Sequence, residues 1–359
     1  MITIVLGTRP EIIKMAPVIR ELQKKGENYF ILHTGQHYSR NLDEVFFEQL
    51  KLPRAKYNLE VGSGSHAEQT AKILIGVESV LREESPDIVL VEGDTNSVLA
   101  GALAASKLHI KVGHVEAGLR SYDRQMPEEI NRTLTDHCSD CLFAPTEKAR
   151  RILRGEGVTD DKIFVTGNTI VDAVHQNLEI AKERANSLNT LKLAPREYFL
   201  VTLHRQENVD DSARFSSILE GLDKVATEFH LPVVYPIHPR SRKMMTEFGL
   251  EPRNLELMEP LDFFGYLSLE SNARLILTDS GGVQEEACIL GVPCVTLRDN
   301  TERPETLEVG SNILAGASPD KILNLTRLML HRNTNWRNPF GDGRAGQRIV
   351  ETCEEELNA

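Results

Sequence analysis

LTDSGGVQEE, residues 277–286, joins the end of an apolar, strand-like run to the start of a helical pattern. Residues 273–277 are apolar, and residues 283–290 have a helical pattern that is closed by Gly291 and Pro293. Glycines let a backbone approach a ligand closely, and the N–H groups at a helix start favour an anion. The stretch therefore predicts either a nucleotide site or an ordinary strand-to-helix turn.

The two glutamates of this stretch argue against a bare phosphate cradle, because carboxylates repel phosphate. Glu286, one turn into the helix, could instead accept both hydroxyls of a ribose. The phosphate would then lie at Ser280, Gly281 and Gly282. Taken alone, the stretch favours the ordinary turn, so the rest of the chain has to decide.

Composition limits the class of protein. With 359 residues, 40% hydrophobic and 26% charged, we expect a soluble globular protein of two domains. A net charge of −12 argues against nucleic-acid or acidic-membrane partners. No apolar run approaches membrane length, and the first residues lack the basic start of a signal peptide. Five cysteines without regular spacing favour a reducing cytoplasm, and Cys138 and Cys141 are expected to be buried thiols, not metal ligands.

Strand-like runs alternate with amphipathic stretches along the whole chain. They cover residues 1–6, 29–33, 88–91, 111–115, 141–144 and 163–166 in the first half, and 198–202, 233–237, 255–258, 275–278 and 294–296 in the second. This alternation predicts an α/β fold with two Rossmann-like domains, each with a parallel sheet and crossover helices. Ligands are then expected at the carboxyl ends of strands, in the cleft between the domains.

Polar residues follow several of these strands. Arg9 and Lys14 come after the first, where two cations suit a diphosphate or its sugar, although a solvated face would look the same. Asp94 follows the third and could simply cap the next helix. Glu116 follows the fourth without such an explanation, which favours a functional role.

Further along the chain, Glu128 and Arg132 lie one turn apart on a predicted helix and are expected to face each other. His204 and His238 each follow a strand of the second half. Together with the carboxylates and the glycine turn, these two histidines indicate that the polar residues line one cleft. Residues 62–67 fit a loose dinucleotide fingerprint, but the run before them is a poor strand, so we expect a loop that enters a helix.

Nine motifs now identify a resemblance. The chain is similar nearly end to end to the non-hydrolysing UDP-N-acetylglucosamine 2-epimerases, through GTRPEIIKMAP, EGDTNSVLAGALAA, HVEAGLRS, PEEINRTLTDH, FVTGNTIVDA, LHRQEN, LTDSGGVQEEA, RDNTERPE and NPFGDGRAGQRI. The resemblance implies a fold of the GT-B type with its active site in the inter-domain cleft. The first domain would be residues 1–170, with the C-terminal helix 342–359 packing back on it, and residues 171–341 would bind UDP. It also implies a homodimer that supplies mannosamine units for surface polysaccharides or glycans.

By the same resemblance, Asp94, Glu116 and Glu128 match the family's catalytic carboxylates, and Arg132 matches the partner of the third. His204 matches a catalytic or phosphate-contacting histidine. The implied substrate and UDP contacts are Arg9, Lys14, His204, His238, Tyr266, Ser280, Gly281, Gly282, Glu286 and Arg303. Leu261 stands where some relatives have Gln, so this chain departs from the pattern at one uridine contact. In the segment 36–44, Glu44 replaces a Gln of relatives that bind a second UDP-GlcNAc, which predicts weaker activation.

The chemistry suits these residues. The C2 proton of UDP-GlcNAc is not next to a carbonyl, so exchanging it requires either oxidation with NAD or expulsion of UDP from C1. Carboxylates and cations serve the second route, so we expect no cofactor and no metal, with UDP-GlcNAc and UDP-ManNAc as the partners. The alternatives are a hydrolysing epimerase, an epimerase of a diacetamido uronic acid sugar, a GT-B glycosyltransferase and a non-catalytic UDP-sugar sensor.

Overall fold

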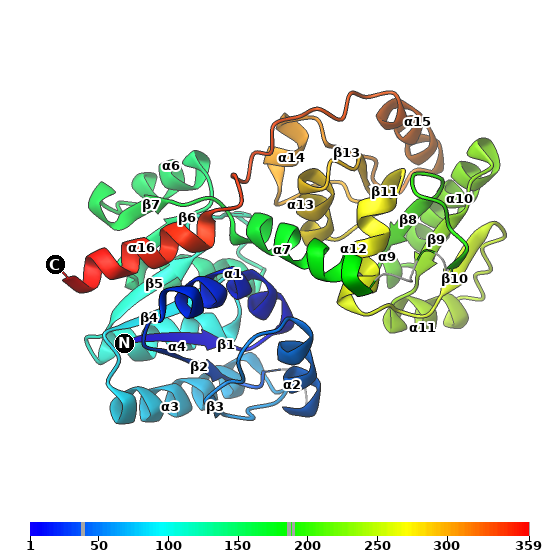
Figure 1. Ribbon diagram of the computed structural model, residues 1–359. Helices are drawn as coiled ribbons and strands as arrows, with labels where there is room; N and C mark the ends of the chain where they lie inside the picture. The colour runs from blue at the N-terminus through cyan, green and yellow to red at the C-terminus, as the bar shows by residue number, and fades with distance from the viewer. Residues whose placement is uncertain (37–39, 185–187, 189–190, 359) are drawn as a thin grey trace. The chain divides into compact units, whose positions relative to one another are not determined.

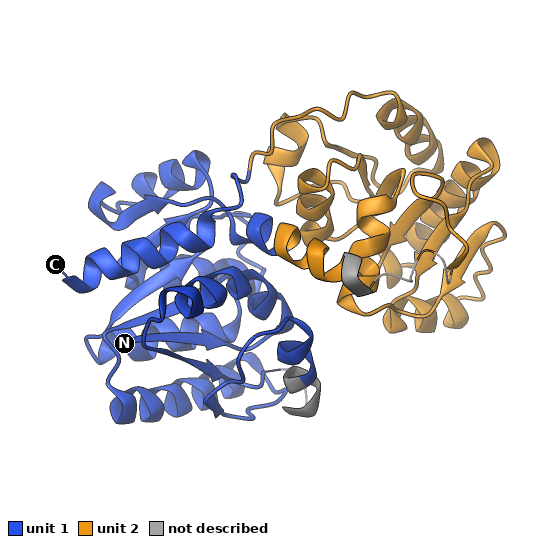
Figure 2. Ribbon diagram, viewed as in Figure 1, with its two compact units in different colours: residues 1–173, 340–359 blue, residues 174–339 orange. Residues whose placement is uncertain are grey.

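The computed structural model describes residues 1–36, 40–184, 188 and 191–358 of the chain, and it divides into two compact units (Figure 2). Unit 1 comprises Met1–Ala173 and Phe340–Ala359, and unit 2 comprises Val174–Pro339. The boundary falls within α7 (Thr169–Arg184). Each unit is built around one parallel sheet, which confirms the predicted α/β fold with two Rossmann-like domains of GT-B type.

Among the described residues, unit 1 has a seven-stranded sheet in the order β3-β2-β1-β4-β5-β6-β7 (Figure 1). In chain order its elements are β1 (Ile2–Leu6), α1 (Arg9–Lys25), β2 (Tyr29–His33), α2 (Arg40–Gln49), β3 (Tyr57–Asn58), α3 (His66–Glu84), β4 (Ile88–Glu92), α4 (Asn96–Lys107), β5 (Lys111–Val115), α5 (Pro127–Cys138), β6 (Cys141–Ala144), α6 (Glu147–Gly155), the 3₁₀ turn Asp160–Lys162, β7 (Ile163–Val165) and, at the end of the chain, α16 (Ala345–Asn358).

The described part of unit 2 has a six-stranded sheet in the order β10-β9-β8-β11-β12-β13. Its elements are β8 (Phe199–Thr202), α9 (Gln206–Val209), α10 (Ser212–Phe229), β9 (Val233–Pro236), α11 (Pro239–Glu247), β10 (Leu255–Met258), α12 (Phe263–Asn272), β11 (Leu275–Thr278), α13 (Gly281–Ile289), β12 (Cys294–Thr296), α14 (Pro304–Glu308), β13 (Asn312–Leu314) and α15 (Pro319–Leu330).

The central strands are apolar because helices cover both faces of the sheet. Every residue of β1 and β4 is buried. Gly101 lets α4 pack tightly on these strands, since a Cβ at this position would lie 3.1 Å from a methyl of Val5 and 3.3 Å from one of Val91. The loops that follow β1, β4 and β5 therefore come from a rigid sheet and emerge side by side at its carboxyl edge.

The C-terminal helix α16 packs on α1 within unit 1. The Asp172 carboxylate accepts the N–H groups of Ala345 and Gly346 at 3.2 and 3.0 Å. It thereby supplies hydrogen-bond partners to N–H groups at the start of α16 that have none within the helix. A Cβ on Gly346 would lie only 2.9 Å from the backbone of Pro17, so glycine is required for this close approach. Among the described residues, none of the helices is both long and apolar enough to cross a bilayer.

Candidate active site

In unit 1, Lys14 lies between two buried carboxylates. Its Nζ is 3.2 Å from Glu92 Oε1 and makes a short ion pair with Glu116 Oε2. Lys14 was predicted to point at a ligand over the start of α1; the structure shows that its charge is shared between the loops after β4 and β5. Arg9, at the start of the same helix, places its guanidinium 5.6 Å from the centre of the Phe46 ring.

Glu92 was not among the predicted site residues. Burial raises its pKa well above the ordinary range, the nearby charge of Lys14 opposes this, and the charge of Glu116 adds to it. A hydrogen bond between Glu92 and Glu116 raises the pKa of Glu92 further. Glu116 has a positive φ of 69°, a conformation that a residue other than glycine adopts only when its surroundings impose it.

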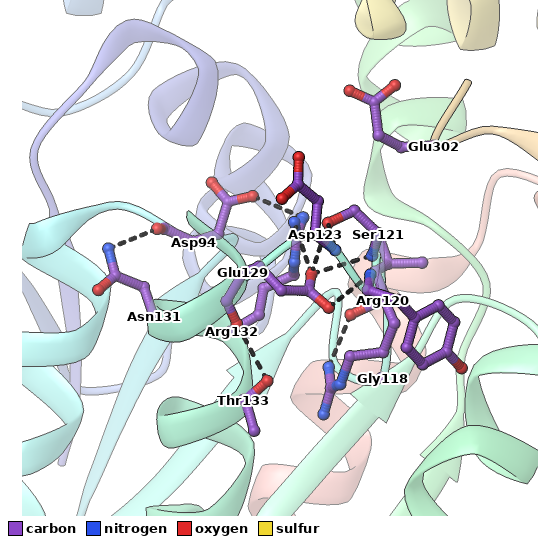
Figure 3. Close-up of polar contacts among 12 residues, drawn as sticks. Asp94, Gly118, Arg120, Ser121, Asp123, Glu129, Asn131, Arg132, Thr133 and Glu302 are labelled. Atoms are coloured by element: carbon purple, nitrogen blue, oxygen red, sulfur yellow. Dashed lines mark hydrogen bonds and ion pairs between the residues drawn. The ribbon is translucent and has the colours of Figure 1, made fainter. Parts of the chain in front are cut away.

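Arg132 on α5 makes two ion pairs, one with Asp94 Oδ2 at 2.9 Å and one with Glu129 Oε2 at 3.1 Å (Figure 3). The predicted pairing of Arg132 with Glu128 is therefore wrong. The spacing rule for helix neighbours allowed either glutamate, and Glu129 is the one on the buried side. Asn131 also donates to the carbonyl of Asp94 at 2.9 Å, so α5 holds Asp94 by its backbone and by its side chain.

Glu129 has a structural role that its sequence position did not reveal. It accepts the N–H groups of Ser121 and Tyr122, both at 2.9 Å, and the Ser121 hydroxyl at 3.0 Å (Figure 3). Burial raises its pKa, but these donors and Arg132 outweigh burial and lower the pKa below its usual range. The negative charge of Glu129 is therefore used to fix the loop before α5.

Glu128, the neighbouring residue, is exposed and lines a cavity of about 250 Å³ together with Asp94. Burial raises the pKa of Asp94, the charge of Arg132 opposes this, and the charges of Glu116 and Glu128 add to it. All three predicted catalytic carboxylates are thus within electrostatic reach of one another. The cavity wall also includes Gln36, His66 and Asn131.

The alternative role for Asp94, capping the next helix, is also wrong. Thr95 is the N-cap of α4, and its hydroxyl accepts the N–H of Val98 at 3.4 Å. The Thr95 hydroxyl also donates to Glu11, which accepts the N–H of Gly7 as well. Burial raises the pKa of Glu11 to about 7. Glu11 therefore links the loop after β1 to the loop that carries Asp94, a role that no sequence pattern indicated.

In unit 2, the glycine turn is the first turn of a helix. α13 begins at Gly281, two residues earlier than predicted, and Ser280 is its N-cap. The first N–H groups of a helix have no partner inside it, and here the exposed Gly282 leaves them uncovered. A Cβ on Gly282 would have only the Ser280 hydroxyl within 4 Å. A helix start of this kind favours an anion, so the predicted phosphate site at Ser280, Gly281 and Gly282 stays a prediction.

The two glutamates of α13 face different partners. Glu285 is buried, and its Oε1 lies 2.8 Å from Nε of Arg303. Glu286 is partly exposed and hydrogen-bonds Glu270, whose pKa is raised well above its usual range by burial and then by the charge of Glu286. Burial and the charges of Glu270 and Glu286 also raise the pKa of the Tyr266 phenol. Glu286 therefore lies beside two buried groups, Glu270 and Tyr266, whose pKa values its charge raises.

The two predicted histidines of unit 2 lie together. The rings of His204 and His238 are 5.7 Å apart between centroids. Asp279, which was not predicted as a site residue, lies 3.2 Å from Nδ1 of His204 and accepts the N–H groups of His204 and Arg205 at 3.0 and 2.9 Å. Although burial raises the pKa of Asp279, these contacts lower it below its usual range. Nε2 of His204 is thus left for another partner.

His238 is the N-cap of α11, where its Nδ1 accepts the N–H of Arg240 at 3.2 Å. Burial and then the charge of His204 lower its pKa, so His238 is neutral near pH 7. Leu261, the departure from the family pattern, packs against the apolar cluster behind Tyr266. These contacts place every predicted UDP residue of unit 2 around the carboxyl edge of its sheet.

Other features of the described residues carry less chemistry. No group of three or more His, Cys, Asp or Glu within the described ranges could hold a metal ion. Cys141 is buried and Cys138 partly so, and burial raises their thiol pKa values to about 12 and about 11, as expected for inert thiols.

A larger hollow of about 600 Å³ in unit 2 contains none of the predicted residues. The predicted effector segment includes residues 37–39, which lie outside the described residues.

Two parallel sheets, each with polar residues at the carboxyl ends of its strands, define an α/β protein of the GT-B class with a helix N-terminus that suits a nucleotide diphosphate. The sequence model of the UDP-N-acetylglucosamine 2-epimerases matches residues 20–354. The UDP-N-acetylglucosamine 2-epimerase of Methanocaldococcus jannaschii is 56% identical over 356 residues, with 97% of each chain covered. The chain therefore belongs to the UDP-N-acetylglucosamine 2-epimerase family.

Solved structures agree with this assignment. The UDP-GlcNAc 2-epimerase of Methanocaldococcus jannaschii, solved in complex with UDP-GlcNAc and UDP, is 55% identical and has a TM-score of 0.89 over 99% of both chains. The enzyme from Neisseria meningitidis, solved with UDP-GlcNAc bound, is 36% identical and has the same TM-score over 99% of both chains. A relative from Pseudomonas aeruginosa, UDP-2,3-diacetamido-2,3-dideoxy-D-glucuronate 2-epimerase, is 41% identical over 350 residues, with 97% of each chain covered.

Proposed function

We propose that this protein interconverts UDP-GlcNAc and UDP-ManNAc by inverting C2 of the sugar, without a cofactor or metal. The observation that carries the proposal is the set of carboxylates in unit 1. Asp94, Glu116 and Glu128 influence one another electrostatically, and Arg132 and Lys14 neutralise two of them. The epimerases that are 55% and 56% identical support UDP-GlcNAc as the substrate.

The reaction that fits these groups begins with an elimination. A carboxylate takes the proton from C2, the electrons of the C2–H bond form a C1=C2 double bond, and the C1–O bond breaks so that UDP leaves with its electron pair. The product of this step is 2-acetamidoglucal. In the reverse direction C2 receives a proton from the opposite face, and a phosphate oxygen of UDP forms the new bond to C1.

Unit 1 supplies groups for both proton transfers. The pKa values of Asp94 and Glu92 are raised, which brings carboxyl groups closer to the pH at which they can both give and take a proton. Lys14 lies within ion-pair distance of both Glu92 and Glu116, so its charge would stabilise either carboxylate after it gives up a proton. Glu128, on the wall of the cavity with Asp94, is the third candidate for proton transfer.

Unit 2 supplies groups for the leaving UDP. The N-terminus of α13 at Ser280, Gly281 and Gly282 would take a phosphate, and Glu286 would accept the ribose hydroxyls. His204 and Arg303 would stabilise the negative charge that develops as the C1–O bond breaks. Both are already fixed by buried carboxylates, so little reorganisation would be needed.

The assignments of Arg9, His238 and Tyr266 as further substrate contacts belong to the same proposal. So do a homodimer and a cytoplasmic role in supplying mannosamine units. Light scattering on the purified protein would give the mass in solution, and a monomer at working concentration would contradict the dimer.

The decisive experiment is to incubate the protein with UDP-GlcNAc in D₂O and to follow the sugars by NMR. We expect UDP-ManNAc with deuterium at C2 of both nucleotide sugars, together with traces of UDP and 2-acetamidoglucal. Free ManNAc and UDP would instead show a hydrolysing epimerase. Turnover of a diacetamido uronic acid sugar but not of UDP-GlcNAc would move the chain to the other epimerase class, and full retention of the C2 proton would refute the elimination.

A further inference from the structure

His114 is a buried histidine that the proposed reaction leaves without a role. It lies on β5, its side chain is fully buried, and each of its ring nitrogens has one partner. Nδ1 is 2.6 Å from Oδ1 of Asp136, and Nε2 is 2.9 Å from the carbonyl oxygen of Gly93. These two partners belong to α5 and to the loop after β4, so His114 connects three parts of unit 1.

The contacts of Asp136 show that its carboxylate is ionised. Its Oδ2 accepts the N–H of Gly118 at 3.2 Å and an N–H of Arg120 at 2.7 Å, and the Arg120 guanidinium also pairs with Glu156 at 2.6 Å. Gly118 and Arg120 can only donate, and the guanidinium charge of Arg120 beside Oδ2 stabilises the ionised form of the carboxyl. Burial raises the pKa of Asp136, but the charges of His114 and Arg120 lower it overall, in agreement with this reading.

His114 bridges its two partners through both ring nitrogens. One partner is the carboxylate of Asp136 on α5, and the other is the backbone carbonyl of Gly93 in the loop after β4. Because the ring is fully buried, losing either contact would leave a buried polar group without its partner, which is costly.

The network ends at the two loops that carry the catalytic carboxylates. On one side, Gly93 precedes Asp94, and its N–H donates to the carbonyl of Val115 at 3.2 Å. On the other side, Glu116 has its positive φ, and Gly118, with a φ of 81°, is held by Asp136. A Cβ on Gly118 would lie 2.6 Å from a backbone oxygen of Ala149. Only glycine therefore lets the loop pass this close to Ala149.

We propose that His114 is a positioning residue that, through its two ring-nitrogen contacts, holds the Gly93–Asp94 turn and the Glu116 loop at a fixed separation. It does not contact the reacting atoms. Its effect on turnover would come from the strained backbone of Glu116 and from the placement of Asp94. The inference rests on the proposed function only for its effect on activity, because the loop rigidity stands by itself.

The first test is on the wild-type protein. Labelling the histidines with ¹⁵N shows whether each ring nitrogen makes a hydrogen bond, and a His114 variant identifies the signals by their loss. We expect both ring nitrogens of His114 to be hydrogen-bonded. A ring nitrogen of His114 without a hydrogen bond would overturn the proposal, whatever the activity of the protein.

The second test uses His114→Asn and His114→Gln, which retain at most one of the two contacts. The matched control is Val112→Ala, which removes buried methyl groups from the same strand and leaves both loops untouched. We expect kcat for UDP-GlcNAc to fall by about 10²-fold in the His114 variants, because small displacements of catalytic groups have effects of this size. KM should change by less than about twofold, since unit 2 binds UDP.

Amide hydrogen exchange provides a readout that does not depend on turnover. The amides of Gly93 and Gly118 should exchange faster in the His114 variants and remain slow in Val112→Ala. If kcat and exchange in all three variants follow thermal stability alone, His114 is merely a packing residue and the proposal fails. A wild-type protein without turnover would refute the proposed function, while the ring-nitrogen signals and the exchange rates would still decide the role of His114.

Discussion

Glu128 and Glu129 are adjacent in the first turn of α5, and the structure gives them opposite roles. The pair Glu128→Gln and Glu129→Gln tests this division directly, because both changes keep the shape of the side chain and remove one charge. We expect Glu128→Gln to lose turnover and keep stability. We expect Glu129→Gln to lose stability, with a smaller effect on the chemistry itself.

The magnitude for Glu129 follows from its contacts. Its carboxylate accepts two N–H groups, one hydroxyl and the Arg132 guanidinium, and it is buried. An amide can replace only part of this acceptor capacity and leaves Arg132 with less charge compensation. Breaking a buried pair by removing one partner costs about 3–5 kcal/mol, and retained hydrogen bonds reduce the figure to about 3 kcal/mol. For a unit of this size, Tm should fall by about 10 °C.

For Glu128 the structure gives no comparable stability effect. The residue is exposed on the wall of a cavity, and surface substitutions of this kind change stability by less than about 0.5 kcal/mol. As a proton-transfer group its loss should lower kcat by about 10²-fold or more. The assay is conversion of UDP-GlcNAc followed by NMR, with thermal unfolding measured on the same samples.

Two results would refute this reasoning. Near-normal kcat in Glu128→Gln would remove Glu128 from the catalytic groups. A Glu129→Gln protein that is as stable as the wild type but inactive would show that the two roles are reversed, and the pairing of Arg132 with Glu129 would then be part of the chemistry.

Three further substitution experiments and one chelation experiment test the rest of the site. Asp94→Asn and Glu116→Gln should each lower kcat by about 10²-fold with the fold intact, as checked by circular dichroism; normal turnover in both would make these residues structural. Glu286→Gln should weaken UDP binding measured by calorimetry by about tenfold, and unchanged affinity would exclude the ribose contact. Activity should survive EDTA without added NAD, and loss of activity on chelation or release of NAD on denaturation would contradict the cofactor-free reaction. Because the folded-state pKa of Glu11 is about 7, above the ordinary 4.5, folded protein binds the extra proton between these values. Stability from Glu11 is therefore complete below pH 4.5 and falls as the pH rises to 7, by on the order of 3 kcal/mol. Glu11→Gln should remove this fall in urea unfolding at pH 5 and pH 8, and an unchanged difference would refute it.

The sequence predicted the fold well where strands are long and buried. All the apolar runs that we took as strands are strands, and β2, β5, β6, β10, β11 and β12 begin and end where predicted. β3 and β13 were missed because edge strands of two or three residues have no apolar run of their own. Helix starts were predicted less accurately. α13 begins at Gly281 because Gly281 and Gly282 adopt the helical conformation and do not form a separate turn before the helix.

The site was predicted as a set of residues but not as a set of partners. The spacing of Glu128 and Arg132 is compatible with a pair, yet Arg132 takes Asp94 from another loop and Glu129 from its own helix. Long-range partners of this kind depend on which strands are neighbours, and a single helix pattern carries no such information. Glu11 and Glu92 were missed for the same reason, since their roles exist only once β1, β4 and β5 lie side by side.

The consecutive glutamates in both units follow one physical logic. Neighbouring residues on a helix point about 100° apart, so one member of a pair can be buried while the other reaches a cavity or solvent. In α5, Glu129 fixes Arg132 and Glu128 remains exposed; in α13, Glu285 fixes Arg303 and Glu286 remains partly exposed. Each buried glutamate holds a cation in place, and we propose that its exposed neighbour contacts the ligand. A proposed phosphate cradle followed by two glutamates is therefore not a contradiction, because the first carboxylate binds an arginine of the protein and the second is the one that we propose for the nucleotide.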